Sequence, residues 1–211
     1  MAAERETERD LNRPRIALLS GPIGVGKTTI AHRVVGLARQ QGLVCGGVLA
    51  PAIKDRQGRK VGIWGINLRT GQRRTLARTD RDLGGPTVGI YSFDGEALAW
   101  AVQVVEQVLA PSTTPPCDLV IVDEIGKLEL WQGMGLAPLL PQLGEAKGPW
   151  VLVLVRDSLL AELQSRLGPG ERLIFRASEE NREEMPAHIV YTFWPQKEMN
   201  ATSRGEKTRT D

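Results

Sequence analysis

The chain has 211 residues, of which 41% are hydrophobic and 25% charged, proportions typical of a water-soluble domain with one substantial core. Its 27 basic and 25 acidic residues leave a net charge of +2, so no overall field marks it as a binder of nucleic acid or membrane surfaces. Two cysteines, Cys45 and Cys117, and two histidines suggest neither a disulfide framework nor a zinc site.

The two ends of the chain differ in character from the rest. Residues 1–14 are charged where a signal peptide would need an apolar core, and no apolar run approaches the length of a membrane span. Residues 196–211 are polar as well. We therefore expect flexible tails at both ends, a single domain over residues 15–195 and a cytoplasmic location.

The first predicted strand, residues 16–19, is a short apolar run that suits a strand buried on both faces. It leads into the stretch SGPIGVGKTT, which fits the phosphate-binding pattern GxxxxGK[ST] from Gly21 to Thr28. A helix is predicted over residues 28–41, because apolar side chains recur there at helical spacing and Gly42 follows. Strand, glycine-rich loop and helix in this order are the context that the motif requires.

This loop is the first candidate site. Its glycines let the backbone close around a β-phosphate, and the following helix N-terminus adds its dipole. Lys27 is predicted to reach the β- and γ-phosphate oxygens, and Thr28 to place its hydroxyl on Mg²⁺. The flanking strand and helix argue against the alternative, a glycine-rich turn with a surface lysine. The predicted nucleotide-binding residues here are Ser20, Gly21, Pro22, Ile23, Gly24, Val25, Gly26, Lys27, Thr28 and Thr29.

After the first helix the hydrophobic period changes to that of strands, with turns at DRQG and RTGQ, and we expect an inserted antiparallel β-meander over residues 44–94. Helical spacing returns over residues 96–109. The apolar runs at 118–122 and 150–155 are each followed by a polar residue and a predicted helix, as strands of a parallel sheet are. The expected fold is α/β, with the ligand at the carboxyl ends of the strands.

The segment VDEIGKLE ends the second of these apolar strands and is the second candidate site. Asp123 is placed to hold Mg²⁺ directly or through its water, and Glu124 to polarise an attacking water, which favours hydrolysis over a kinase reaction. Glu124 is alternatively a helix-start carboxylate or a salt-bridge partner. Lys127 is equally compatible with a charge near the γ-phosphate and with a solvated loop residue. The predicted nucleotide-binding residues of this segment are Val122, Asp123, Glu124, Ile125, Gly126, Lys127, Leu128 and Glu129.

No NKxD segment is present to recognise guanine, so we expect loose selectivity for the base. Three aromatic residues, Trp64, Tyr91 and Trp131, are candidates to stack on it. Lone aromatic residues more often serve in packing, so the sequence does not choose among them.

Together these segments resemble a known family, the cancer-related nucleoside-triphosphatases or THEP family, which are small RecA-like P-loop NTPases. The resemblance covers residues 16–194 and is carried by GPIGVGKTT, GGVLAP, GRKVGIWGINLRTGQRRTLAR, VGIYSFD, VDEIGKLEL and SEENREEMP. It implies slow, Mg²⁺-dependent hydrolysis of several nucleoside triphosphates, with the segments from Ser20 and from Val122 lining the nucleotide. From the residues themselves, Lys27, Glu124 and Lys127 are the catalytic candidates. It also implies that the strand at 150–155 lies between the phosphate-loop strand and the Asp123 strand.

Several positions depart from the family pattern. Polar family residues on the strand after GG are replaced by Ala50, Pro51, Ala52 and Lys54. Trp64 and Ile90 also stand at more polar family positions, while Asn181 and Arg182 match the segment before the last helix. The departures leave open one alternative to a hydrolase, a nucleotide-dependent switch protein with negligible turnover. A second alternative is a small-molecule P-loop kinase, which shares the same loop but against which Glu124 argues. The sequence names no protein partner.

Overall fold

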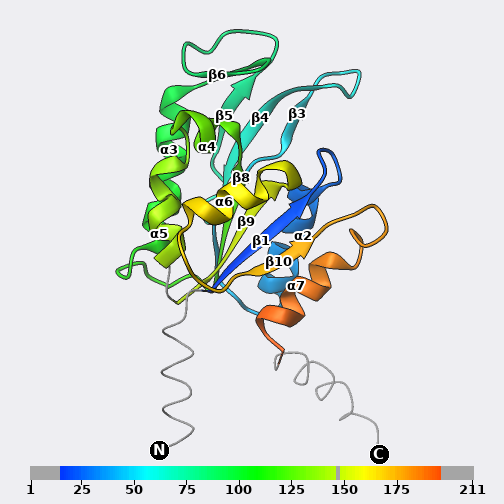
Figure 1. Ribbon diagram of the computed structural model, residues 1–211, viewed down its shortest axis with the longest axis vertical. Coiled ribbons are helices and arrows are strands. Elements are labelled where there is room, and N and C mark those ends of the chain that lie inside the picture. Colours follow the sequence, from blue (N-terminus) through cyan, green and yellow to red (C-terminus); the bar gives the residue numbers. More distant parts are fainter. Residues whose placement is uncertain (1–14, 146–147, 196–211) are drawn as a thin grey trace, which may run out of the picture.

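The computed structural model describes residues 15–145 and 148–195, which form one ten-stranded sheet with helices on both faces (Figure 1). The predicted terminal tails lie outside the described residues. No helix within the described ranges is long and apolar enough to cross a membrane. The strands are β1 (Ile16–Gly21), β2 (Cys45–Leu49), β3 (Ala52–Lys54), β4 (Lys60–Asn67), β5 (Arg73–Arg78), β6 (Thr87–Val88), β7 (Tyr91–Phe93), β8 (Leu119–Ile125), β9 (Trp150–Arg156) and β10 (Leu173–Arg176).

The helices and short 3-10 segments cover this sheet. They are α2 (Lys27–Gln40), α3 (Gly95–Leu109), α4 (Lys127–Gln132), η1 (Ala137–Leu139), α5 (Leu140–Glu145), η2 (Asp157–Leu159), α6 (Leu160–Arg166) and α7 (Met185–Phe193).

The centre of the sheet is parallel. Its strands run in the order β10, β1, β9, β8, β2, and every neighbouring pair among them is parallel. The predicted place of the 150–155 strand, between the phosphate-loop strand and the Asp123 strand, is therefore confirmed. The side chains of residues 119–122 and 151–155 are fully buried, because helices cover both faces of these two strands.

Antiparallel strands extend the sheet beyond β2, in the order β4, β5, β7, β6. The short strand β3 pairs with the first half of β4, on the edge that β2 leaves uncovered. These strands form the upper part of the molecule in Figure 1 and confirm the predicted antiparallel insertion. The prediction was wrong about its first strand, since β2 pairs in parallel with β8 and belongs to the central sheet. The chain leaves β2 at Ala50 and Pro51, which separate it from β3.

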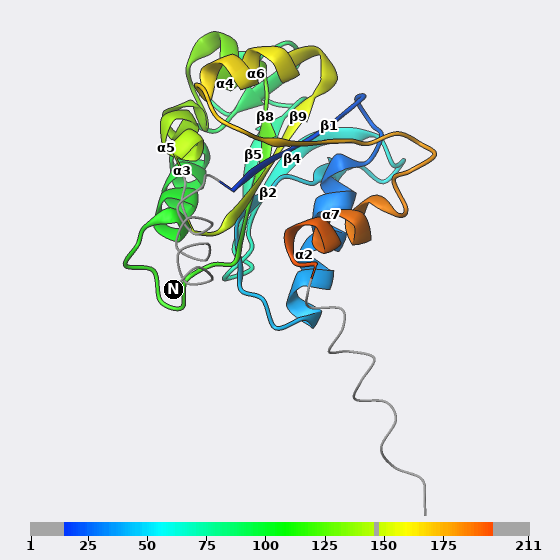
Figure 2. The same ribbon diagram turned by 60° about the horizontal axis from the view of Figure 1, so that its bottom comes forward.

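Two hydrophobic cores lie on opposite faces of the sheet. Helices α2 and α7 cover one face, and α3 with the α4–α6 region covers the other (Figure 2). In α2 Ile30, Val34 and Ala38 are buried, as the predicted helical spacing requires. In α3 Val104 and Val108 are buried in the core, whereas Val102 is only partly buried against it.

Candidate nucleotide-binding site

The glycine-rich loop joins β1 to α2 at the carboxyl end of β1 (Figure 1). A Cβ on Gly21 would lie 2.7 Å from the carbonyl oxygen of Ala177, so no larger residue fits at the start of the loop. Gly26, the residue before α2, has a φ of 102°, a conformation that favours glycine. The loop thus places the unpaired backbone N–H groups of the α2 N-terminus at the carboxyl end of β1, where they can bind an anion.

Lys27 points into this loop. Its side chain is largely buried, and its Nζ donates hydrogen bonds to the carbonyl oxygens of Gly21 at 2.8 Å and Pro22 at 3.0 Å. Burial lowers the pKa of the Lys27 ammonium, and the nearby Arg156 lowers it further, while the carboxylates of Glu124, Asp157 and Asp123 oppose that shift. The lysine therefore stands among three acidic side chains and one further cation.

Asp123 lies at the end of β8 and is 3% exposed. Its Oδ2 accepts the backbone N–H of Ala50 at 2.9 Å, and its Oδ1 accepts the hydroxyl of Thr28 at 3.3 Å. Burial raises the pKa of the Asp123 carboxyl to about 6, and the adjacent Glu124 acts in the same direction. A hydroxyl and a carboxylate oxygen that converge in this way are hard oxygen donors of the kind Mg²⁺ prefers.

Glu124 pairs with a residue that sequence reasoning missed. Nε of Arg156 donates to Oε1 of Glu124 at 3.0 Å, and about a third of each side chain is exposed. Arg156 is the last residue of β9 and lies in register with Gly21 of β1. Glu124 therefore does form a salt bridge, as the sequence allowed, and this salt bridge lies within the candidate site.

A second polar contact joins the ends of β1 and β9. The hydroxyl of Ser20, which is completely buried, donates to a carboxylate oxygen of Asp157 at the start of η2. The signal for Arg156 and Asp157 was present in the sequence, because both directly follow a buried apolar strand.

Lys127, the third catalytic candidate, is exposed and contacts an aromatic ring. Its Nζ lies 4.6 Å from the centroid of Trp131, and Nε1 of Trp131 in turn donates to Glu162 at 2.9 Å. The indole is 59% exposed. The Lys127 ammonium thus has an aromatic ring as its contact in this structure.

Glu129 is buried and accepts hydrogen bonds from the backbone. Its carboxylate accepts the N–H of Gly126 at 2.8 Å, at the start of α4, and that of Leu136 at 3.4 Å. Burial raises the pKa of this carboxyl. The structure thus gives Glu129 a role in holding α4 and the turn after it.

The two predicted segments contain supporting side chains as well as accessible ones. Val25, Val122, Ile125 and Leu128 point into the cores, so their side chains hold the segments in place. Pro22, Ile23, Gly24 and Thr29 are exposed.

The pair that matched the family segment before the last helix shapes a turn. Asn181 accepts the N–H of Ser178 and donates to the carbonyl of Arg176, each at 2.9 Å. Arg182 is exposed and lies 3.8 Å from the carboxylate of its neighbour Glu183. Asn181 therefore closes the turn between β10 and α7.

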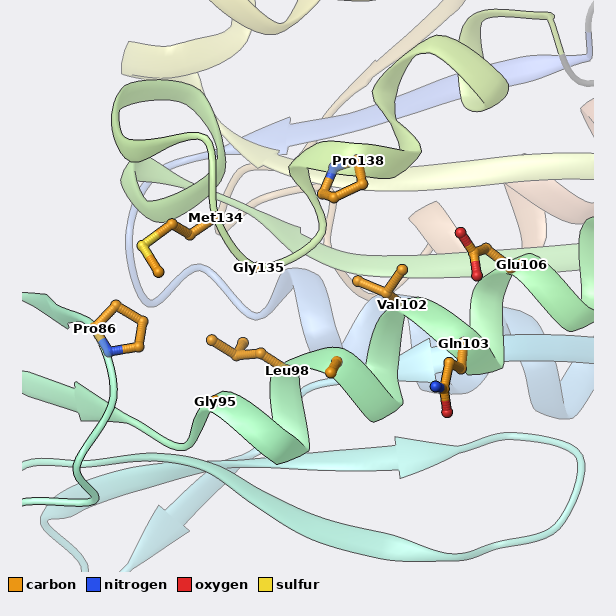
Figure 3. Close-up of a pocket in the computed structure, with 10 residues that line it drawn as sticks. Pro86, Gly95, Leu98, Val102, Gln103, Glu106, Met134, Gly135 and Pro138 are labelled. Atoms are coloured by element: carbon orange, nitrogen blue, oxygen red, sulfur yellow. The ribbon is translucent and has the colours of Figure 1, made fainter.

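A hollow of about 460 Å³ lies elsewhere, between α3 and the segment around η1 (Figure 3). Its walls are mainly apolar and include Leu98, Val102, Met134 and Pro138, with Glu106 at its margin. None of its lining residues belongs to the glycine-rich loop or to the Asp123 segment. It is a separate feature from the candidate site.

Known proteins resemble this chain in sequence and in fold. The model of a family described as NTPase matches residues 16–190. The chain belongs to this NTPase family. Among its relatives, the nucleoside-triphosphatase THEP1 of Methanopyrus kandleri is 29% identical over 84% of this chain and 94% of its own length. THEP1 of Thermofilum pendens is 30% identical over 82% of this chain and 92% of its own length.

Two solved structures resemble this NTPase family member. The solution structure of a human cancer-related nucleoside triphosphatase superposes with a TM-score of 0.65 at 25% identity, covering 86% of this chain and 98% of that one. The crystal structure of THEP1 from Aquifex aeolicus gives a TM-score of 0.67 at 19% identity, covering 85% and 99% of the two chains. The predicted P-loop NTPase fold is confirmed.

Proposed function

We propose that this protein hydrolyses nucleoside triphosphates to the diphosphate and inorganic phosphate, in the presence of Mg²⁺ and with broad tolerance of the base. The observation that carries the proposal is the convergence of Lys27, Asp123 and Glu124 at one end of the sheet, beside the N-terminus of α2. The names of the relatives, nucleoside-triphosphatases, support it.

In the binding step, the nucleotide would contact the loop from Ser20 to Thr29 and the segment from Val122 to Glu129. Backbone N–H groups at the start of α2 would receive the phosphates, and Lys27 would exchange its two carbonyl acceptors for phosphate oxygens. Thr28 and Asp123 would hold Mg²⁺. When bound, the ion neutralises charge on the β- and γ-phosphate oxygens.

The chemical step is assigned to Glu124. In our proposal its carboxylate accepts a proton from a water molecule whose oxygen forms a bond to the γ-phosphorus. The bond between that phosphorus and the β–γ bridging oxygen breaks, and its electron pair stays on the departing diphosphate. Lys27 remains on the phosphate oxygens while charge shifts to the bridging oxygen.

A second candidate function, a nucleotide-dependent switch protein with negligible turnover, draws on one observation. Ala50, one of the positions where the family carries polar residues, lies directly beside Asp123, and its backbone N–H binds that carboxylate. With fewer polar groups beside the proposed metal-binding carboxylate, the protein would hold a bound nucleotide without hydrolysing it. Among the residues that the structure describes, no contact supports the kinase alternative.

The test is phosphate release from ATP, GTP, CTP and UTP, with Mg²⁺ and with excess chelator, alongside nucleotide affinity by calorimetry. Release of phosphate from several of them that requires Mg²⁺ supports the hydrolase. Tight binding without phosphate release supports the switch. Formation of the diphosphate without release of inorganic phosphate, and only in the presence of a small-molecule acceptor, supports the kinase. We also expect the protein to act in the cytoplasm, which fractionation of the source cells tests.

A further inference from the structure

Arg156 occupies a central place at the open end of the sheet. It ends β9, which pairs with β1 on one side and with β8 on the other. In the β1 ladder Arg156 lies opposite Gly21, the first glycine of the loop, and in the other direction its guanidinium contacts Glu124. The arginine therefore stands between the phosphate-binding loop and the residue to which we assign the chemical step.

The guanidinium of Arg156 has donors to spare. Its Nε binds Glu124 at 3.0 Å, and over residues 15–145 and 148–195 it makes no other hydrogen bond. Its two terminal amino groups remain for another acceptor, and a third of the side chain is exposed at the site. A planar group with two parallel N–H donors matches two oxygens of one phosphate.

Charged side chains of both signs lie around Arg156. Arg156 and Lys27 are close enough to repel each other, and the carboxylates of Glu124, Asp157 and Asp123 offset part of that repulsion at Lys27. Glu124 meets Arg156 through a single contact, whereas a terminal phosphate offers three oxygens to the two cations.

We propose that Arg156 binds the γ-phosphate of the nucleoside triphosphate and stabilises the charge on it during hydrolysis, releasing Glu124 from their ion pair as it does so. This proposal rests on the proposed function and deepens it. The release leaves the Glu124 carboxylate able to accept the proton of the attacking water. Hydrolysis is thereby coupled to the presence of a γ-phosphate, which a diphosphate lacks.

Lys127, the residue that sequence reasoning placed in this role, is less well placed. Its ammonium lies over the Trp131 ring, which is itself fixed by Glu162. Arg156 reaches the site from a buried central strand, whose rigid backbone holds it beside Glu124. A fixed donor costs less conformational entropy on binding than an exposed lysine does.

The experiment compares Arg156→Ala, Arg156→Gln and Arg156→Lys with the wild type. Arg33→Ala is the matched control. It removes an arginine of α2 that forms an exposed ion pair with Glu183. Each variant is tested for single-turnover ATP hydrolysis, for affinity to ADP and to a non-hydrolysable ATP analogue, and for capture of ADP with aluminium fluoride. ADP affinity also reports whether the variant has folded.

We expect Arg156→Ala and Arg156→Gln to slow single-turnover hydrolysis on the order of 10³-fold, the scale of an arginine that stabilises a transferring phosphoryl group. ADP affinity should stay within about threefold, while the preference for the analogue over ADP and the aluminium fluoride complex are lost. Arg156→Lys should keep part of the preference for the ATP analogue over ADP, because lysine retains the positive charge but lacks the two parallel N–H donors of the guanidinium. Lys127→Ala should slow hydrolysis less than Arg156→Ala.

Three outcomes would overturn the proposal. One is hydrolysis by Arg156→Ala and Arg156→Gln at the wild-type rate. Another is slow hydrolysis in these variants with the analogue preference and the aluminium fluoride complex intact, since Arg156 would then only position Glu124. The third is an equal loss in Arg33→Ala. If the wild type itself releases no phosphate, the proposed function fails, and the analogue preference still decides whether Arg156 binds the γ-phosphate.

Discussion

The hydroxyl of Thr28 and the carboxylate of Asp123 lie 3.3 Å apart although 95 residues separate them in the chain. Thr28 is in the first turn of α2, and Asp123 is near the end of β8. They meet because β1 and β8 run parallel on either side of β9, so that both carboxyl ends reach the same edge of the sheet. The proposed metal site is thus a consequence of the strand order.

Replacement of Lys27 by alanine should weaken the binding of ATP in the presence of Mg²⁺. A hydrogen bond to a charged group contributes about 1.5–3 kcal/mol, which corresponds to a rise in Kd of roughly 10- to 100-fold. Calorimetric titration with a non-hydrolysable analogue measures it, and Lys60→Ala, which changes an exposed lysine of β4, is the control. Equal affinity in the Lys27 variant and the wild type would remove the loop lysine from the site.

Asp123→Asn should reduce Mg²⁺ dependence and nucleotide affinity together. The asparagine oxygen can still accept the Ala50 N–H, but the negative charge that favours the cation is gone. Since loss of a supporting contact around a metal ligand already costs about 10- to 100-fold in affinity, loss of the ligand's charge should cost at least that. Titrating Mg²⁺ at fixed ATP tests this, and an unchanged Mg²⁺ midpoint would show that Asp123 does not bind the ion.

Glu129 should prove to be a stabilising residue, with no part in the reaction. Glu129→Ala leaves the N–H groups of Gly126 and Leu136 unpaired, at about 1–3 kcal/mol for a fully buried group, whereas Glu129→Gln keeps an acceptor. Urea unfolding of both variants measures the free energies. A stable Glu129→Ala protein that binds ATP normally and fails to hydrolyse it would show that Glu129 takes part in the reaction.

The same residue gives a dependence on pH with a definite sign. Burial raises the pKa of Glu129 in the folded protein above the ordinary value of 4.5, so the folded state binds this proton more tightly than the unfolded chain. Its contribution to the free energy of unfolding is therefore largest below pH 4.5 and falls as the pH rises through the folded pKa. Glu129→Gln should reduce that slope in unfolding measured across the interval, and an identical slope would refute the assignment.

The proposed site should tolerate all four bases. A pocket that contacts the base mainly by stacking discriminates by roughly 1–3 kcal/mol, so kcat/KM for ATP, GTP, CTP and UTP should agree within about a hundredfold. Phosphate release from each nucleotide measures the ratios. A preference for one base well beyond that range would require a hydrogen-bonding base pocket.

Local patterns made the strand, loop and helix around Lys27 predictable, because apolar periodicity and glycine spacing are properties of neighbouring residues. Arg156 was missed although the place of its strand was predicted, because its contact with the Glu124 carboxylate is seen only when the ends of β8 and β9 are packed side by side. Glu129 was placed with its neighbours in the nucleotide-binding segment, and only tertiary packing reveals that its carboxylate binds backbone. The edge strand β10 escaped prediction because its four residues are partly exposed and carry little periodicity.

The role of Glu124 in hydrolysis is decided by comparing Glu124→Gln with the wild type. Glutamine keeps the size of the side chain and its ability to accept a hydrogen bond from Arg156, but it removes the charge and the basicity. Binding should survive while the chemical step fails.

The measurement is single-turnover hydrolysis of ATP with excess enzyme and Mg²⁺, together with nucleotide Kd. We predict that Glu124→Gln lowers the single-turnover rate by about 10²- to 10⁴-fold, the range of general-base catalysis, while Kd changes by less than about tenfold. Hydrolysis by Glu124→Gln at the wild-type rate would contradict it, because the proton of the attacking water would then be accepted by a group other than Glu124.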